Sequence, residues 1–292
     1  MAGFTYVGVP IDSVGRSGGT EHGPAKLREL GLADVCGADA GDLDVRIRGE
    51  ERDPLTGIVG SADVLTATAA IRDATAARIA TGERPFLAGG CCAELPGALA
   101  GARDTLGRVG VAYLDGHLDL YDGVTSPTGE GADMPLSVAL GRGPGAWVDA
   151  CGGASARASD VIPIGHRDVD ELPTLEGIGS ELGDGFRHVS KDAVRAEGPA
   201  VVGERIAAEL AAGPGRFWLH LDVDVLGEDV FPATDYLMPD GLTMDELVSL
   251  MRPFGTSPSL VGVSLGCYNP EKDPLDVYGR ALVDAFRAAL AG

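Results

Sequence analysis

Two short clusters of acidic side chains, far apart in the chain, have the composition of a metal site. They are Asp115-Gly116-His117-Leu118-Asp119 and Asp222-Val223-Asp224. Each directly follows an apolar run that is typical of a buried strand, 109–114 before the first and 217–221 before the second. Converging buried carboxylates are costly without a cation, and carboxylates joined by one imidazole favour Mn²⁺ or a similar hard divalent ion. Each cluster alone could be an Asp-rich turn or a strand cap, so the prediction of a metal site rests on their occurring together.

The apolar runs that would position these clusters alternate with helical patterns. Runs typical of strands lie at 6–11, 85–88, 109–114, 160–164, 217–221 and 260–265, and helical patterns lie at 61–81, 243–253 and 281–290. This alternation predicts an α/β fold with a mostly parallel sheet that is covered on both faces. Function in such folds lies at the carboxyl ends of the strands, where both acidic clusters fall.

Local signals set the expected boundaries of the helices and loops. Ser61 is placed to cap the first clear helix. Thr243 and Glu246 form a capping box, and the helix that they open is expected to stop near Pro253. The stretches expected to be surface loops, both rich in Gly, Asp and Arg, are 37–57 and 141–159.

Composition bounds the domain organisation and the partners. The 292 residues, 45% of them hydrophobic, suffice for one large core, so residues 1–292 are interpreted as a single domain. A net charge of −21 argues against nucleic-acid binding, which needs clustered Lys and Arg. Apolar runs stay too short to span a membrane and the chain starts as a strand, so we expect a cytoplasmic protein without a signal peptide. The five cysteines show no repeated spacing and are expected to be reduced.

Six motifs along the chain resemble those of the ureohydrolases, the family of arginase, agmatinase and formiminoglutamase. Residues 115–119 resemble the family's DAHxD motif, and 221–225 resemble its SxDxD motif. Near the start of the chain, residues 7–12 resemble the family's first strand and 23–28 resemble the GPxxIR motif that follows it. Residues Gly89-Gly90-Cys91-Cys92-Ala93 resemble GGDHS. Residues 165–170 resemble GxRDVD, and 268–270 resemble YNP. The resemblance implies a three-layer α/β domain, usually assembled as a homotrimer or homohexamer, in which two Mn ions activate water.

Matched residue by residue, the resemblance implies a ligand set with one change. Five of the family's six ligands are kept, namely Asp115, His117, Asp119, Asp222 and Asp224, whereas the sixth, a His, is Cys92 here. A thiolate is a soft ligand and Mn²⁺ is a hard ion, so an ion beside Cys92 should bind more weakly, or Zn, Fe or Co should replace it. One ion and two ions both stay open, as does a defunct subsite in which Cys92 is a plain buried residue.

Further departures from the family concern the substrate. The family's guanidinium-binding Glu falls on Cys267, and the proton-shuttle His of arginase falls on Ala132, so water or Asp119 would deliver the proton. By the same match, the side chains at the far end of the substrate would be Tyr121, Thr128, Glu130 and Asp170. Tyr121 would narrow the pocket and Glu130 would repel a carboxylate, unless both face solvent in a loop. L-Arginine is therefore disfavoured, and activated substrates such as N-hydroxyguanidines are compatible.

Other histidines and cysteines admit structural interpretations. His220 lies inside the strand before Asp222, where it would be a core residue or would orient a ligand through its second nitrogen. Cys91 adjoins Cys92, and such a vicinal pair could bind thiophilic metals or oxidise.

Three functions stay open from the sequence. The first is a hydrolase of a linear C–N bond in an amidino, guanidino or N-hydroxyguanidino group, with His117 as a ligand and Asp119 as proton relay. The second is a single-metal amide deacylase, because the metal-dependent deacetylases resemble this fold and their ion corresponds to the position that contains His117. The third is a non-catalytic relative. The five retained ligands favour a hydrolase, because a structural role does not require so many converging carboxylates.

Overall fold

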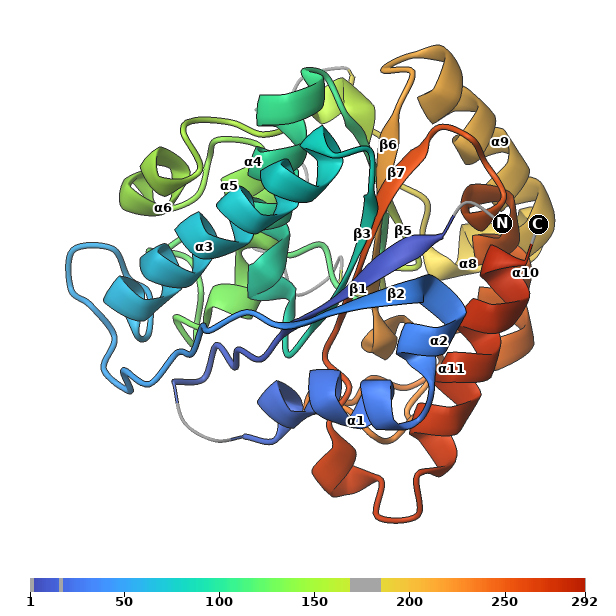
Figure 1. The fold of residues 1–292 in the computed structure, drawn as a ribbon, viewed down its shortest axis with the longest axis horizontal. Helices are drawn as coiled ribbons and strands as arrows, with labels where there is room; N and C mark the ends of the chain where they lie inside the picture. The colour runs from blue at the N-terminus through green and yellow to red at the C-terminus, as the bar shows by residue number, and fades with distance from the viewer. Residues whose placement is uncertain (1–2, 16–17, 169–184, 292) are drawn as a thin grey trace.

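The computed structural model describes residues 3–15, 18–168 and 185–291, and a parallel sheet lies at its centre (Figure 1). Within these residues the strands are β1 (Phe4–Val9), β2 (Gly37–Asp42), β3 (Arg84–Gly89), β4 (Gly110–Leu114), β5 (Val161–Ile164), β6 (Phe217–Asp222) and β7 (Leu260–Gly266). Their order across the sheet is β2-β1-β3-β7-β6-β4-β5, and all neighbours are parallel. The six strands expected from the apolar runs are all present.

Helices cover both faces of this sheet and complete a three-layer α/β fold, as predicted. One face carries α3 (Ser61–Ala80), α4 (Leu95–Leu106), α5 (Pro135–Ala139) and α6 (Gly145–Ala150) (Figure 1). The other carries α1 (Gly23–Glu29), α2 (Leu32–Cys36), α8 (Lys191–Glu197), α9 (Pro199–Ala212), α10 (Met244–Gly255) and α11 (Val277–Leu290). Successive side chains of β3 enter different cores: Phe86 and Ala88 pack on the α11 side and Leu87 on the α4 side. Burial on both faces explains why such strands are apolar throughout.

The prediction for 37–57 was wrong at its start, because this stretch begins with the strand β2. Its sequence, GADAGD, has no large apolar side chain, and its residues are mostly exposed. β2 pairs in parallel with β1 at the edge of the sheet. An edge strand that buries neither face shows no alternation of apolar and polar residues, so only its backbone hydrogen bonds reveal it.

Two further boundaries differ from expectation. The stretch 141–159 contains α6, which is held by buried Trp147, whose Nε1 donates a hydrogen bond to Thr68 Oγ1 over 2.8 Å. Ser61 does not cap α3, because Gly60 precedes the helix with a left-handed φ of 61°. A Cβ at Gly60 would lie 2.7 Å from the carbonyl oxygen of Gly49, so this turn requires glycine.

The helix α10 has the predicted start and a later end. Glu246 N–H donates to Thr243 Oγ1 over 3.2 Å, and Thr243 N–H donates to Glu246 Oε2 over 2.8 Å, which completes the capping box. The helix continues through Pro253 to Gly255. Burial of Phe254 stabilises this last turn and offsets the one hydrogen bond that proline cannot donate.

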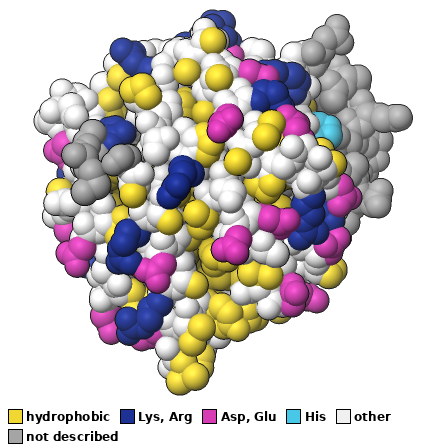
Figure 2. All heavy atoms as spheres, turned by 90° about the vertical axis from the view of Figure 1, so that its right-hand side faces the viewer, with side chains coloured by type: hydrophobic (Ala, Val, Ile, Leu, Met, Phe, Trp, Pro, Cys, Tyr) yellow, Lys and Arg dark blue, Asp and Glu magenta, His cyan; other side chains and the backbone are white. Residues whose placement is uncertain are grey.

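The surface over α9 to α11 mixes charges of both signs, with hydrophobic side chains gathered along one edge (Figure 2). Ion pairs on this side include Arg205 with Glu197 at 2.8 Å and Arg187 with Glu209 at 2.7 Å. In the part of the chain that the structure describes, no helix is long and apolar enough to cross a membrane. All five cysteines are free in this structure.

Candidate metal centre

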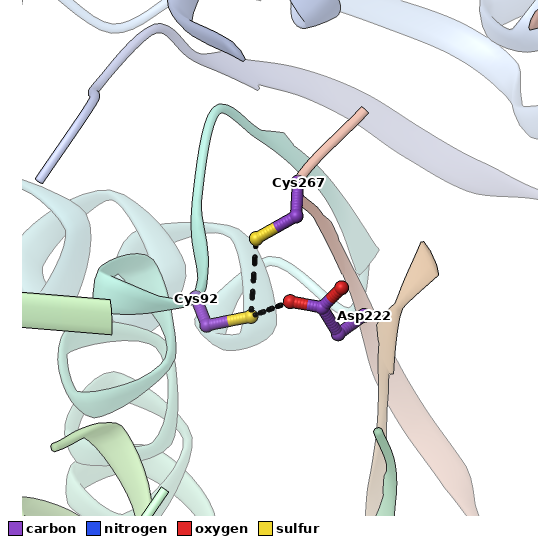
Figure 3. A group of neighbouring side chains, drawn as sticks. All are labelled: Cys92, Asp222 and Cys267. Atoms are coloured by element: carbon purple, nitrogen blue, oxygen red, sulfur yellow. Dashed lines mark hydrogen bonds between the residues drawn. The ribbon is translucent and has the colours of Figure 1, made fainter. Parts of the chain in front are cut away.

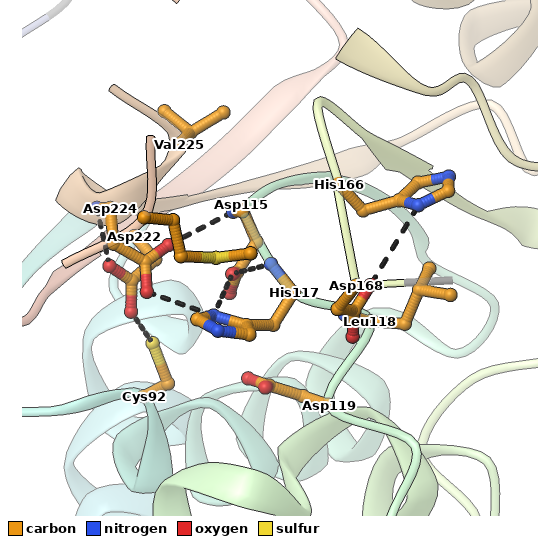
Figure 4. A network of polar contacts seen from close by, with 12 residues as sticks. Cys92, Asp115, His117, Leu118, Asp119, His166, Asp168, Asp222, Asp224 and Val225 are labelled. Carbon is orange, nitrogen blue, oxygen red and sulfur yellow. Dashed lines mark hydrogen bonds and ion pairs between the residues drawn. The ribbon is translucent and has the colours of Figure 1, made fainter. Parts of the chain in front are cut away.

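Four neighbouring strands end at one point, and each end carries a candidate ligand. Across the sheet the four run in the order β3, β7, β6 and β4. Cys92 follows β3, Cys267 follows β7, Asp222 ends β6 and Asp115 follows β4. Parallel strands present their carboxyl ends at the same edge, so side chains distant in sequence meet here (Figure 4).

The loops after β4 and β6 are joined by direct contacts between the two acidic clusters. His117 Nδ1 lies 2.9 Å from Asp224 Oδ2, and Gly116 N–H donates to Asp224 Oδ1 over 2.9 Å. A Cβ at Gly116 would lie 2.7 Å from the Asp224 carbonyl oxygen, so glycine permits this approach. Arg167, in the loop after β5, contacts both loops, because its N–H donates to the Gly116 carbonyl over 2.8 Å and its Nη2 donates to the Asp224 carbonyl over 2.8 Å. The loop after β6 is therefore held firmly against the loop after β4.

Asp115 gives the clearest sign that a cation belongs between these loops. Its Oδ1 accepts a hydrogen bond from His117 N–H over 2.7 Å, whereas its Oδ2 is buried with no hydrogen-bond partner in the described residues. Ligand atoms of Asp115, Asp222 and Asp224 lie within 4.8 Å of one another, and so do those of Asp115, His117 and Asp119. Carboxylate oxygens and one imidazole fit Mn²⁺ or a similar ion.

Without a cation, the charges of this cluster oppose one another. Burial, followed by repulsion from Asp224, raises the pKa of Asp115 to about 7. Burial and then the charge of Asp115 raise the pKa of Asp119 well above its usual value. Burial disfavours the charged form of His117, but Asp224 and Asp115 outweigh it and raise the pKa of this imidazole. Protonated His117 thus provides positive charge among these carboxylates. A metal ion would displace the proton and provide that charge instead.

Asp119 completes the acidic cluster from an unusual backbone position. Its φ is 48°, a left-handed value that is rare outside glycine and concentrates at functional sites. The Tyr113 hydroxyl donates a hydrogen bond to Asp119 Oδ2 from within β4. The carboxylate is thus fixed by its backbone and by one buried donor, and it lines a pocket.

A second group of ligands lies on the other side of Asp222 and is rich in sulfur (Figure 3). Cys92 Sγ lies 2.7 Å from Asp222 Oδ2 and 3.7 Å from Cys267 Sγ. His220 Nε2 lies 3.2 Å from the same Cys92 sulfur, so this histidine contacts a candidate ligand. Cys91 belongs to none of the candidate ligand groups among the described residues. Two thiols beside one carboxylate do not fit Mn²⁺ as the His117 group does.

A pocket of about 150 Å³ opens beside the carboxylates. Of the residues expected to contact the substrate, Tyr121, Thr128 and Cys267 line it, and so does Ala132. Glu130 reaches it through Tyr236, a lining residue whose hydroxyl donates to Glu130 Oε2 over 2.5 Å. The last residue of that prediction, Asp170, lies outside the described residues.

Tyr113 and Tyr236 were missed at the sequence level. Tyr113 could have been found, because side chains two apart on a strand share a face and Asp115 follows it by two. Tyr236 lies in a loop without a local signal, and its edge-on approach to His117, with ring centroids 6.3 Å apart, depends on tertiary structure. His188 also lacks a local signal in the sequence, and its Nδ1 lies 2.8 Å from Nε2 of His166.

Comparison with known proteins agrees with this fold. The sequence model of the Arginase family matches residues 2–291. The arginase of Eremothecium gossypii is 27% identical over 278 residues, or 89% of this chain and 67% of that protein, and Homo sapiens arginase-1 is 27% identical over 289 residues, or 93% and 87%. A solved arginase structure from Bacillus caldovelox has the same fold, with a TM-score of 0.89 at 24% identity over 100% of this chain and 99% of that one. The chain therefore belongs to the arginase family.

Proposed function

We propose that this chain is a metal-dependent hydrolase that breaks a C–N bond of an amidino or guanidino group in a small molecule. The observation that carries the proposal is the convergence of four carboxylates and one imidazole beside a single pocket. The relatives named arginase support the same class of reaction.

The hard ligands between β4 and β6 would hold the ion that this reaction needs. They are Asp115, His117, Asp222 and Asp224, whose donor atoms fit Mn²⁺. A divalent ion bound there supplies Lewis-acid chemistry and lowers the pKa of water. Gly116 and Arg167 keep the two loops in register, so these ligands are positioned before an ion arrives.

Asp119 is the side chain that we propose moves the proton. Tyr113 holds its Oδ2 by a hydrogen bond, which leaves Oδ1 to accept a proton from water and to pass it to the leaving amine. Ala132 lines the same pocket without a titratable group, so it cannot share this role.

The pocket favours a weakly basic reacting group with an amine at its far end. Cys267 presents a thiol where a carboxylate would be needed to anchor a full guanidinium charge. An N-hydroxyguanidine is less basic and enters uncharged more readily. The Glu130 carboxylate, joined to the lining residue Tyr236, attracts an amine and repels a carboxylate.

The test is product release by Mn²⁺-loaded protein from a panel of guanidines, N-hydroxyguanidines, amidines and N-acyl amines. We expect urea-type products, with N-hydroxyguanidines cleaved faster than their parent guanidines. Asp119→Asn should reduce turnover by at least about 100-fold, the lower range for a lost general acid–base. The matched control is Asp149→Asn, which changes an exposed carboxylate on α6. Cleavage of N-acyl amines alone would instead identify an amide hydrolase.

A further inference from the structure

The thiols of Cys92 and Cys267 belong to a separate group of candidate ligands at the carboxyl end of the sheet. They follow the neighbouring strands β3 and β7, and their sulfur atoms lie 3.7 Å apart. Asp222 Oδ2 lies 2.7 Å from the Cys92 sulfur, and the ligand atoms of all three residues lie within 4.8 Å of one another. Figure 3 shows the three side chains converging from separate strand ends.

We propose that Cys92, Cys267 and Asp222 form a binding site for a thiophilic divalent cation, with Zn²⁺ as the representative ion. Two sulfurs bound to one tetrahedral Zn²⁺ lie about 3.8 Å apart, given Zn–S bonds of about 2.3 Å. The observed separation of 3.7 Å between the two sulfur atoms already matches this distance. A carboxylate oxygen on the same ion would lie about 3.6 Å from a sulfur, so Asp222 must withdraw by about 0.9 Å when the cation replaces the thiol proton.

The backbone holds both sulfurs at this separation. Cys267 has a left-handed φ of 70°, which is unfavourable for a residue other than glycine, and its N–H donates to the Gly90 carbonyl over 2.8 Å. Its thiol thereby faces Cys92 (Figure 3). A Cβ at Gly266 would lie 3.1 Å from the Cys92 sulfur, so the end of β7 approaches Cys92 closely.

A chain of hydrogen bonds supports Cys92 from inside the protein. Trp218 Nε1 donates to Ser264 Oγ over 2.9 Å, which in turn lies 2.7 Å from His220 Nδ1. If Ser264 donates to Nδ1, the proton of neutral His220 lies on Nε2, which is 3.2 Å from the Cys92 sulfur. An N–H group aimed at a ligand sulfur stabilises the thiolate and fixes its orientation.

The opposite side of the group is open. Cys267 and Asp222 line the pocket, so an ion held by three protein ligands keeps its fourth place toward the pocket. This is the arrangement of reactive rather than purely structural zinc sites. The inference goes beyond the proposed hydrolase, because it concerns which cation binds and holds whether or not a guanidine is cleaved.

Cobalt absorption tests the site directly, because Co²⁺ bound to thiolates shows strong near-ultraviolet charge transfer and Co²⁺ bound only to oxygen and nitrogen does not. Reduced, metal-free protein with five titratable thiols would be titrated with Co²⁺. We expect the charge-transfer band to appear in the unmodified chain, to fall by about half in Cys267→Ser, and to disappear when Zn²⁺ but not Mn²⁺ is added. Cys91→Ala is the matched control, and its band should be unchanged.

A second readout is metal content after loading with equal Zn²⁺ and Mn²⁺ and desalting. We expect one Zn²⁺ to stay with the unmodified chain. Cys267→Ser should weaken Zn²⁺ binding by more than about 100-fold, because loss of a residue that only contacts a ligand typically costs no more than about 100-fold. Absence of the charge-transfer band in the folded, unmodified chain would overturn the proposal, and this measurement needs no variant. So would a Cys267→Ser chain, folded by circular dichroism, that keeps the full band and full Zn²⁺ content.

Discussion

The hydroxyl of Tyr113 donates a hydrogen bond to Oδ2 of Asp119, joining the interior of β4 to the loop that follows it. Tyr113 is fully buried and its ring stacks on His220, with centroids 4.8 Å apart and planes 18° apart. Because His220 in turn contacts Cys92, one aromatic pair lies behind both groups of ligands. The geometry of both groups of candidate ligands therefore depends on this aromatic pair.

Replacing Tyr113 by Phe should weaken Mn²⁺ binding without unfolding the chain. The ring and its stacking stay, and only the donor to Asp119 is lost. Asp119 shares a candidate ligand group with Asp115 and His117, so its carboxylate also contributes to the metal site. Loss of such an outer partner typically costs about 10- to 100-fold in metal affinity, and calorimetric titration of metal-free protein would measure it. Tyr6→Phe is the control, because it removes an equally buried hydroxyl that donates to the Pro24 carbonyl, away from the site. Equal affinities in the two variants would contradict a role for Tyr113.

Metal removal should lower the stability of the chain. When no cation is bound, burial and then repulsion from Asp224 raise the pKa of Asp115, so the ionised carboxylates are destabilised. Mn²⁺ at 100 times its dissociation constant should add about 2.7 kcal/mol to the free energy of unfolding for one site, and chelation should remove it. Thermal melts with Mn²⁺ and with a chelator measure the difference. Asp115→Asn should shrink this difference, whereas identical melts of the unmodified chain would favour a non-catalytic relative.

The sequence predicted the elements that are buried on both faces and the residues that follow them. β4 and β6 are continuous apolar runs, so their ends, and the acidic residues there, could be located by pattern alone. β2 could not be located, because an exposed edge strand of Gly, Ala and Asp has no such pattern. A strand produces a recognisable apolar pattern in the sequence only where its side chains are buried.

Contacts between distant strand ends were beyond local patterns. Cys92 and Cys267 are 175 residues apart, and they meet only because β7 inserts between β3 and β6 in the sheet. That order follows from packing of the whole chain, since each crossover could in principle place its strand elsewhere. The family resemblance placed both residues in the site, but it assigned Cys92 to a metal and Cys267 to the substrate. Their pairing required the structure.

Acidification should reveal a contribution of His166 to stability. Burial, and then the neighbouring His188, lowers the pKa of His166 to about 4, whereas an unfolded histidine titrates near about 6.5. Below about pH 6.5 the unfolded chain therefore binds a proton that the folded chain does not. This contribution is fully present above about pH 6.5 and is lost as pH falls toward about 4, with a total on the order of 3 kcal/mol.

The measurement compares urea unfolding of the unmodified chain and of His166→Asn at several pH values between 7 and about 4.5. The two free energies of unfolding should approach each other as pH falls, because only the unmodified chain loses the His166 contribution. The comparison is needed because Asp12 also titrates in this range, since burial raises its pKa to about 6. In both proteins Asp12 makes the free energy of unfolding change with pH in the direction opposite to that caused by His166. A constant difference across this range would exclude His166 as the source.

Tyr236→Phe should separate substrate binding from chemistry. The hydroxyl of Tyr236 donates to Glu130 over 2.5 Å, while its ring approaches His117 edge-on, so the bond fixes the ring at the pocket. A net hydrogen-bond contribution of about 0.5 to 1.5 kcal/mol predicts a KM about 2- to 12-fold higher, with kcat changed less than about twofold. Steady-state kinetics on the best substrate of the guanidine panel measure both constants. Tyr278→Phe on α11 is the control, and a Tyr236→Phe enzyme with unchanged KM but lower kcat would instead place this hydroxyl in the chemical step.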